Sequence, residues 1–407
     1  MADASPVVLG EDFIQDRHAL YRRLRRETPV RQALMPDGLR VWLVTRYEDA
    51  RTALASPALS KDSRRAAPIH EQRREEEGGG TPSFLSKVLE SHMLNRDPPD
   101  HTRLRKLVAK AFTLRRIEQL RPRIEQLARS LLDGLAGRDE VNLLVDYAHP
   151  LSVGVAGELF GVPEQERAHF RKIMNQIAFG TFEERGAGAA AMADYLRELV
   201  ARKREEPADD LVTGLVQARD EDDRLDELEL VAMVFLILSA GFESTGNQIG
   251  NSVFALLTNP DQLAALRAEP ELVGGAVEEL LRYDGATGTT TLRFTTEPLK
   301  LGDVEIPAGE FVVIPIGAPN RDEARFPEPD RLDIRRDASG HLAFGHGVHH
   351  CLGAPLARLE TRIALESLLA RFPELSLAVP AAEIRYRDDI LFRSLERLPL
   401  KLGPERG

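Results

Sequence analysis

Cysteine is almost missing from this sequence of 407 residues, which contains Cys351 alone. A single thiol excludes an internal disulfide framework and any zinc or iron–sulfur site built from several cysteines, and it suits a reducing cytoplasm. Long hydrophobic runs are missing too, because the longest strongly apolar run, at about residues 230–238, is too short to span a bilayer. The first six residues lack the features of a signal peptide. We therefore expect a soluble, cytoplasmic protein without a membrane partner.

Positive charge is also in short supply. Lys and Arg total 54 against 65 Asp and Glu, which gives a formal net charge of −11. Because nucleic-acid binders usually present a basic face, we expect no nucleic-acid partner. The chain shows neither an internal repeat nor a clear break in composition. We therefore expect a single domain that covers residues 1–407, large enough to bury a core without disulfides.

Helical periodicity dominates the middle of the sequence. Apolar residues recur at helical spacing through most of residues 101–370. Residues 291–316 instead have the pattern of short strands, with a turn at Gly302. Residues 61–80 are highly charged and residues 180–188 are rich in glycine, which predicts two flexible loops. The expected fold class is therefore mainly α with a small β portion.

One unusually long helix is predicted between residues 226 and 258. Asp226 and Glu229 have the spacing of a capping box at its start. Asn259-Pro260 ends the pattern, because proline cannot continue a helix. The middle of this segment is apolar, which indicates a helix that crosses the core.

The segment Ala240-Gly241-Phe242-Glu243-Ser244-Thr245 interrupts this apolar helix. A mid-helix glycine costs about 1 kcal/mol relative to alanine, and a buried glutamate costs more unless it is paired or protonated. One interpretation is a kink in which Ser244 bonds back to a backbone carbonyl. The other is functional: Gly241 would leave room over the face of a cofactor, and Glu243 with the two hydroxyls could relay protons to bound oxygen.

The lone cysteine lies in the segment Phe344-Gly345-His346-Gly347-Val348-His349-His350-Cys351-Leu352-Gly353. A free cysteine is most often a buried small hydrophobe. The flanking glycines, however, allow a tight backbone close to a flat ligand, and the start of a helix stabilises a thiolate. Zinc binding with the three neighbouring histidines, a nucleophilic Cys/His pair and a thiolate ligand to haem iron are the other interpretations.

The pattern Phe344-x-x-Gly347-x-x-x-Cys351-x-Gly353 resembles the haem-ligand loop of the cytochrome P-450 superfamily, and Ala354 to Arg358 resemble its soluble bacterial members. The resemblance extends over about residues 10–400. It implies a triangular, mainly α fold in which haem b lies between the long central helix and the cysteine helix. It also implies that Cys351 is the iron ligand, that the phenylalanine packs beside its sulfur and that backbone amides donate hydrogen bonds to that sulfur.

Other parts of the chain match further elements of this superfamily. Ala240, Gly241, Glu243 and Ser244 resemble its oxygen-binding motif, with serine in place of the usual threonine and Thr245 next to it. Glu279 and Arg282 resemble its Glu-x-x-Arg element, and Arg331 resembles the third member of that structural network. The positions that match haem-propionate ligands are His101, Arg105, Arg293 and His349.

The resemblance implies a monooxygenase that inserts one atom of O2 into a C–H or C=C bond. No flavin or nicotinamide motif is present, so electrons from NAD(P)H should arrive through a separate ferredoxin or flavodoxin and its reductase. The resemblance places around the pocket the 61–94 loop, the 170–190 region, Phe242, residues 286–292 and residues 391–394. Phe242, Leu292 and Leu391 are apolar, and residues 287–290 are small and polar. This indicates a mainly apolar small molecule with a few polar groups, such as a polyketide, macrolide or terpenoid of secondary metabolism. The alternative is a haem-thiolate sensor or electron-transfer protein, which would not need the acid and alcohol at Glu243 and Ser244.

Overall fold

Helices make up most of the structure, a computed structural model that describes residues 6–36, 38–62, 64–65, 91–220 and 223–405. The α-helices are α1 (Glu11–Gln15), α2 (Arg17–Glu27), α3 (Tyr47–Ala55), α6 (Asp100–Ala111), α7 (Leu114–Asp133), α8 (His149–Phe160), α9 (Arg167–Phe179), α10 (Phe182–Glu205), α11 (Leu211–Gln217), α12 (Glu227–Thr258), α13 (Pro260–Ala268), α14 (Val273–Asp284) and α15 (Ala354–Arg371). Shorter helical turns are η1 (Met93–Asn95), η2 (Leu144–Ala148), η3 (Glu164–Glu166), η4 (Pro270–Leu272), η5 (Pro319–Arg321), η6 (Gly347–His349) and η7 (Ala381–Glu383).

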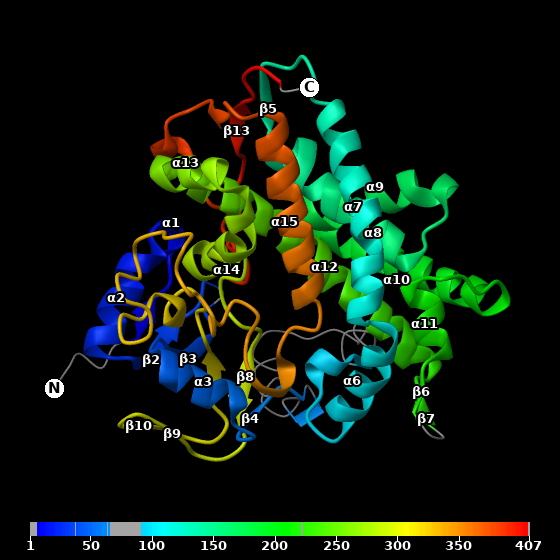
Figure 1. The fold of residues 1–407 in the computed structure, drawn as a ribbon. Coiled ribbons are helices and arrows are strands. Elements are labelled where there is room, and N and C mark those ends of the chain that lie inside the picture. The colour runs from blue at the N-terminus through cyan, green and yellow to red at the C-terminus, as the bar shows by residue number, and fades with distance from the viewer. Residues whose placement is uncertain (1–5, 37, 63, 66–90, 221–222, 406–407) are drawn as a thin grey trace.

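The strands are short and gather mainly beside α2 and α3, away from the helical part (Figure 1). They are β1 (Val7–Val8), β2 (Val30–Leu34), β3 (Arg40–Val44), β4 (Leu59–Ser60), β5 (Glu140–Asn142), β6 (Arg219–Asp220), β7 (Asp223–Arg224), β8 (Arg293–Thr295), β9 (Leu299–Leu301), β10 (Val304–Ile306), β11 (Phe311–Val313), β12 (Ser376–Leu377) and β13 (Pro399–Lys401). This distribution confirms the predicted fold class, mainly α with a small β portion.

The largest sheet joins segments from both ends of the chain. Its strand order is β1-β2-β3-β11-β8-β4. β2 and β3 form an antiparallel hairpin in which Val30 faces Val44, and β11 then adds to β3 in parallel with Val312 opposite Trp42. β8 pairs antiparallel with β11 and β4. The sheet therefore fixes the position of Arg293, the first residue of β8.

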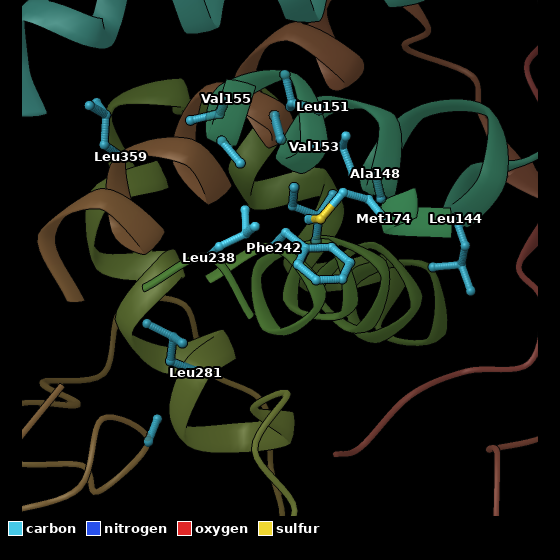
Figure 2. Close-up of a cluster of buried hydrophobic side chains, with 14 of the residues drawn as sticks. Leu144, Ala148, Leu151, Val153, Val155, Met174, Leu238, Phe242, Leu281 and Leu359 are labelled. Carbon is cyan, nitrogen blue, oxygen red and sulfur yellow. The ribbon is translucent and has the colours of Figure 1, made fainter. Parts of the chain in front are cut away.

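The long central helix is confirmed as α12. The Asp226 side chain accepts from the Glu229 amide at 2.8 Å and the Glu229 side chain accepts from the Asp226 amide at 3.0 Å, which completes the capping box. Within the described part of the chain, α12 alone is long and apolar enough to cross a membrane, but most of it is buried inside the fold, as in the core helix of a globular protein. It packs against α8, α14 and α15, and Figure 2 shows Phe242 of α12 beside Met174 of α9 within this core.

The two predicted loops have different outcomes. Most of residues 61–80 lies outside the described residues. The loop predicted at 180–188 is wrong, because α10 begins at Phe182. Thr181 and Glu184 form a reciprocal capping box there, which satisfies free amide groups at the start of the helix. Gly188 lets α10 approach α9 closely, since a Cβ at this position would lie 3.1 Å from the Ile177 side chain.

Candidate active site

The Cys351 loop owes its shape to two glycines and one main-chain hydrogen bond. Gly345 and Gly347 have φ angles of +71° and +75°, a region that non-glycine residues rarely adopt. A Cβ on Gly347 would also lie 2.7 Å from the Leu54 carbonyl oxygen. The Cys351 amide donates to the Phe344 carbonyl at 2.9 Å and closes the loop. Helix α15 begins at Ala354, three residues after the cysteine, with Gly353 as its N-cap.

The Cys351 thiol is exposed and yet desolvated. The residue is exposed by its accessible surface, but the surrounding protein raises the pKa of the thiol. Both observations hold together when the sulfur faces an internal space rather than bulk water. The Gly353 and Ala354 amides hydrogen-bond the sulfur and oppose the rise in pKa. Dipoles of this kind stabilise a thiolate.

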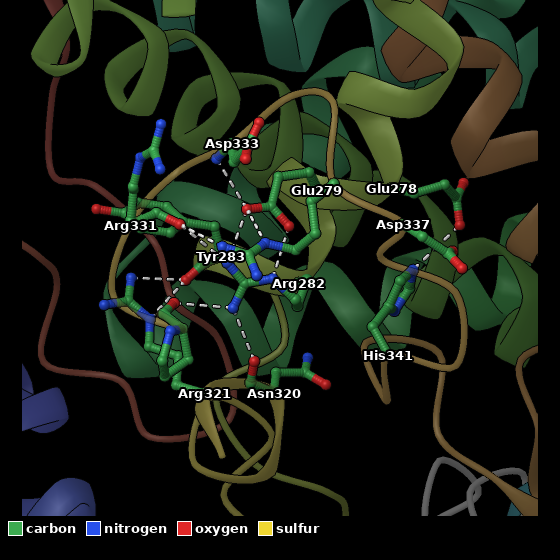
Figure 3. A network of polar contacts seen from close by, with 12 residues as sticks. Glu278, Glu279, Arg282, Tyr283, Asn320, Arg321, Arg331, Asp333, Asp337 and His341 are labelled. Carbon is green, nitrogen blue, oxygen red and sulfur yellow. Dashed lines mark hydrogen bonds and ion pairs between the residues drawn. The ribbon is translucent and has the colours of Figure 1, made fainter. Parts of the chain in front are cut away.

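Phe344 is held beside the loop by a charged cluster. The Arg358 guanidinium lies 4.5 Å from the Phe344 ring centroid. Arg358 is paired in turn with Glu278 at 2.6 Å, and Glu278 also contacts His341 at 3.2 Å. Glu278 and His341 appear on one side of Figure 3. These contacts connect the Cys351 loop to α14 and restrict how the loop can move.

Helix α12 carries a small exposed patch in its otherwise buried middle. Ala240 and Gly241 are exposed, although Phe242 on the same turn is buried. A Cβ built on Gly241 would meet no atom within 4 Å, among the described residues. This part of α12 is therefore uncovered, and the exposed Cys351 lies near the start of α15, the helix against which α12 packs.

The acid and the two hydroxyls lie next to this patch. The Ser244 hydroxyl donates to the Ala240 carbonyl at 2.7 Å, and the Thr245 hydroxyl donates to the Gly241 carbonyl at 2.8 Å. The back-bonding predicted for Ser244 is thus present. Burial, followed by the negative charge of Asp389, raises the pKa of the neighbouring Glu243 to about 7. Such a carboxyl exists in both protonation states near neutral pH.

The predicted propionate-binding residues come together at a buried, positively charged site. The His101 and His349 ring centroids are 4.2 Å apart, and the Arg105 guanidinium donates to the His350 carbonyl at 2.7 Å. Within the described chain, neither ring nitrogen of His101 nor the Nε of Arg293 has a hydrogen-bond partner, although both residues are buried. Desolvation and the surrounding positive groups lower the pKa of His349. Buried donors without partners indicate that an acceptor belongs there.

Sequence reasoning missed two residues of this site. Lys61 is buried and its positive charge acts on both His101 and His349. His92 is buried too, and its Nδ1 has no partner among the described residues. Both precede the helix that carries His101, in segments whose sequence gives no helical or strand signal. For Lys61 the only available signal was its position, because it directly follows the strand that ends at Ser60.

Glu279 and Arg282, which resemble the Glu-x-x-Arg element, form a buried ion pair (Figure 3). Both side chains are completely buried, and their two contacts measure 2.6 and 2.7 Å. The expectation for Arg331 is wrong for its side chain, which is largely exposed and pairs with Glu328; only its carbonyl accepts from Arg282. The third member of the network is Arg336, 3.2 Å from Glu279.

The zinc interpretation of the cysteine loop fails on geometry. Within the described part of the chain, no group of three or more His, Cys, Asp or Glu side chains is arranged to hold a metal ion. His346, His349 and His350 therefore do not form a zinc site with Cys351. A single axial thiolate needs no such cluster, because a porphyrin supplies the other ligands itself.

Comparison with known proteins decides between the remaining interpretations. The sequence profile of the family "Cytochrome P450" matches residues 158–379, more than half of the chain. This chain belongs to the cytochrome P450 family. Cytochrome P450 107B1 of Saccharopolyspora erythraea is 52% identical over 98% of both chains. The vitamin D(3) 25-hydroxylase of Pseudonocardia autotrophica is 47% identical and covers 96% of this chain and 95% of its own.

Solved structures show the same relationship. The tirandamycin C-bound P450 monooxygenase TamI superposes with a TM-score of 0.89 at 45% identity, over 98% of this chain and all of TamI. The fold is therefore the cytochrome P450 fold, and the chain is a soluble bacterial-type P450 monooxygenase of secondary metabolism. It uses haem b and O2 and receives electrons from a separate redox partner. This relationship does not support the sensor alternative.

The residues present fit a haem. The exposed Ala240 and Gly241 offer a flat, small-residue surface for a porphyrin face. The thiol of Cys351 faces an internal space with two amides directed at its sulfur. The nitrogens of His101 and Arg293 that lack partners are the donors that two propionate carboxylates need.

Proposed function

We propose that the Cys351 thiolate ligates the haem iron and that the haem lies between the Cys351 loop and the Ala240–Gly241 patch of α12. The observation that carries this assignment is that Cys351, Ala240 and Gly241 are exposed although they lie on or next to two helices that pack against each other. Phe344, Gly347 and Gly353 shape the loop around the sulfur. The propionates accept from His101, Arg105, Arg293 and His349.

Haem bound through a thiolate supplies the activation of O2 and the transfer of one oxygen atom to the substrate. In this proposal Glu243 supplies protons, because its carboxyl titrates near neutral pH. Ser244 and Thr245 position those protons: each hydroxyl donates to a main-chain carbonyl, so each oxygen can still accept a hydrogen bond. Arg185, Arg387 and Asp389 are the charged groups around Glu243, and the two arginines keep its pKa from rising further.

For the substrate we propose a large, mainly apolar natural product, such as a polyketide, macrolide or terpenoid. The vitamin D(3) in the name of one relative and the tirandamycin C bound to TamI support this class. The apolar residues that the resemblance places at the pocket, such as Leu292, support it too. Thr289 and Thr290 would add hydroxyl groups that orient polar atoms of such a molecule.

The electron donor in this proposal is a ferredoxin or flavodoxin with its own reductase, which docks on the face behind Cys351. NAD(P)H serves only that reductase. We also propose that residues 1–407 form one P450 domain and that the protein works in the cytoplasm, without a nucleic-acid or membrane partner. If purified protein turns over substrate with NAD(P)H and no added redox protein, the proposed electron route is wrong.

The test is the absorption spectrum of the dithionite-reduced protein with and without carbon monoxide. We expect a strongly red-shifted Soret band, and we expect the C351A variant to lose that shift. A haem band without the shift in wild type would refute Cys351 as a thiolate ligand. A panel of polyketides, macrolides, terpenoids and fatty acids is then titrated for spectral shifts on binding. Tight binding of fatty acids alone would refute the substrate class.

A further inference from the structure

Lys61 is an unusual residue because its ammonium group is buried. Only 6% of the residue is exposed, and desolvation and the nearby Arg293 lower its pKa well below the usual value. Its amide donates to Asp97 at 3.0 Å, which fixes the backbone directly after β4. The ammonium nitrogen donates to the Thr291 hydroxyl. An ammonium has three N–H donors, so Thr291 uses only one of them.

The charges around Lys61 do not balance. The pKa values of His101 and His349 are lowered by desolvation and by three nearby cations, Lys61, Arg105 and Arg293. Against this effect, the pKa of His101 is raised by one nearby carboxylate, Asp97. The two Asp97 oxygens are already used, one by the Lys61 amide and the other by Ser60 and the exposed Arg65. Buried charge without a counter-ion is strongly unfavourable. The excess of two positive charges equals the charge of two ionised carboxylates.

We propose that Lys61 is a third cation for the haem propionates, in addition to Arg105 and Arg293, and that its charge raises the reduction potential of the haem. This inference rests on the haem site proposed above. Lys61 positions and polarises the cofactor rather than reacting with substrate. Through Thr291 it also connects the propionates to residues 286–292, a segment that the resemblance places at the substrate pocket.

A carboxylate on the substrate could also satisfy Lys61, so the experiment uses the substrate-free holoenzyme. Three variants separate charge from hydrogen bonding: K61M removes both, K61Q keeps a donor for Thr291 without the charge, and K61R keeps the charge. K300M is the control, because Lys300 is an exposed lysine on β9. The two measurements are the haem reduction potential, by spectroelectrochemical titration, and the rate of haem transfer to apomyoglobin.

Removing a positive charge near the propionates favours the ferric over the ferrous haem. We therefore expect K61M and K61Q to lower the equilibrium constant for reduction about tenfold, which for a one-electron couple is about 59 mV. We expect haem loss to become about tenfold faster, since one charge-assisted hydrogen bond is lost. K61R and K300M should stay within about twofold of wild type in both measurements.

Wild-type potential and haem retention in K61Q would refute the role of the charge. If only K61M differed from wild type, the hydrogen bond to Thr291 would be responsible, and the inference would again be wrong. If K61M and K61Q kept the wild-type potential and haem retention but bound a carboxylate-bearing ligand more weakly in a separate spectral titration, Lys61 would belong to a substrate carboxylate and the inference would be wrong. Each of these measurements is interpreted only if wild type shows the red-shifted carbon monoxide band. Its absence would refute the proposed haem site itself, which distinguishes the two failures.

Discussion

Glu360 offers a quantitative test of the interior far from the chemistry. This residue of α15 is 3% exposed, and the Ser152 hydroxyl of α8 donates to its Oε1 at 2.6 Å. Burial raises the pKa of Glu360 from 4.5 to about 7, against the effect of that hydrogen bond. At 1.36 kcal/mol for each pKa unit, the difference corresponds to about 3 kcal/mol.

The sign follows from proton linkage. Below pH 4.5 the carboxyl is protonated in both the folded and the unfolded chain, so it does not affect stability. Between pH 4.5 and 7 only the unfolded chain releases the proton, and the folded state loses stability as the pH rises. Above about pH 7 the loss is complete. Glutamine keeps the acceptor oxygen for Ser152 but cannot ionise, so E360Q should escape this loss.

The assay is urea unfolding of the holoenzyme at several pH values between 5 and 8. We expect the stability of E360Q to increase relative to wild type by about 2 to 3 kcal/mol across this range. E366Q is the matched control on the same helix, and its difference from wild type should not vary with pH. The infrared absorption of protonated carboxyls should disappear between pH 6 and 8 in wild type, and E360Q should lack the part that belongs to Glu360 while the part from Glu243 remains. Parallel pH curves for wild type and E360Q would refute the reasoning.

Three further substitutions test the haem environment. S244A should lower the yield of product per NAD(P)H consumed severalfold and raise the yield of peroxide per NAD(P)H consumed. S244T keeps a hydroxyl group and should leave both yields unchanged. R282M removes the bidentate partner of the buried Glu279 and leaves Arg336 as its cation, so it should lower the free energy of unfolding by about 3 kcal/mol, seen as a lower urea midpoint. G347A places a side chain at a φ of +75° and should destabilise by about 1 to 3 kcal/mol in thermal unfolding, whereas G274A, in the open part of α14, should not.

Local signals explain which parts of the fold could be predicted. The limits of α12 follow from Asp226, Glu229 and the proline after Asn259, all within a few residues of the helix ends. The start of α10 has an equally local signal in Thr181 and Glu184. It was missed because the glycines and the short gap after α9 indicate a loop, whereas the structure uses Gly188 for close helix packing.

Side-chain partners were harder to predict, because distant segments decide them. Glu279 and Arg282 are one helical turn apart, so their spacing alone indicated no more than a surface pair, and the resemblance pointed to the structural network. Arg331 and Arg336 lie five residues apart in an irregular segment, and only the packed structure shows that Arg336 reaches Glu279. Lys61 meets Thr291 across 230 residues of sequence. No local pattern contains such a contact.

The distribution of buried polar groups argues that the fold depends on its cofactor. His92, His101 and Arg293 each carry a buried nitrogen without a partner in the described chain, and all three belong to the site that also holds Lys61. A folded chain that leaves these donors unsatisfied loses about 1 to 3 kcal/mol for each one. A ligand that binds only the folded state and accepts from them restores that stability by mass action. The same buried groups therefore stabilise the fold through the haem that they bind, and Arg293, together with Lys61, sets the charge environment of that haem.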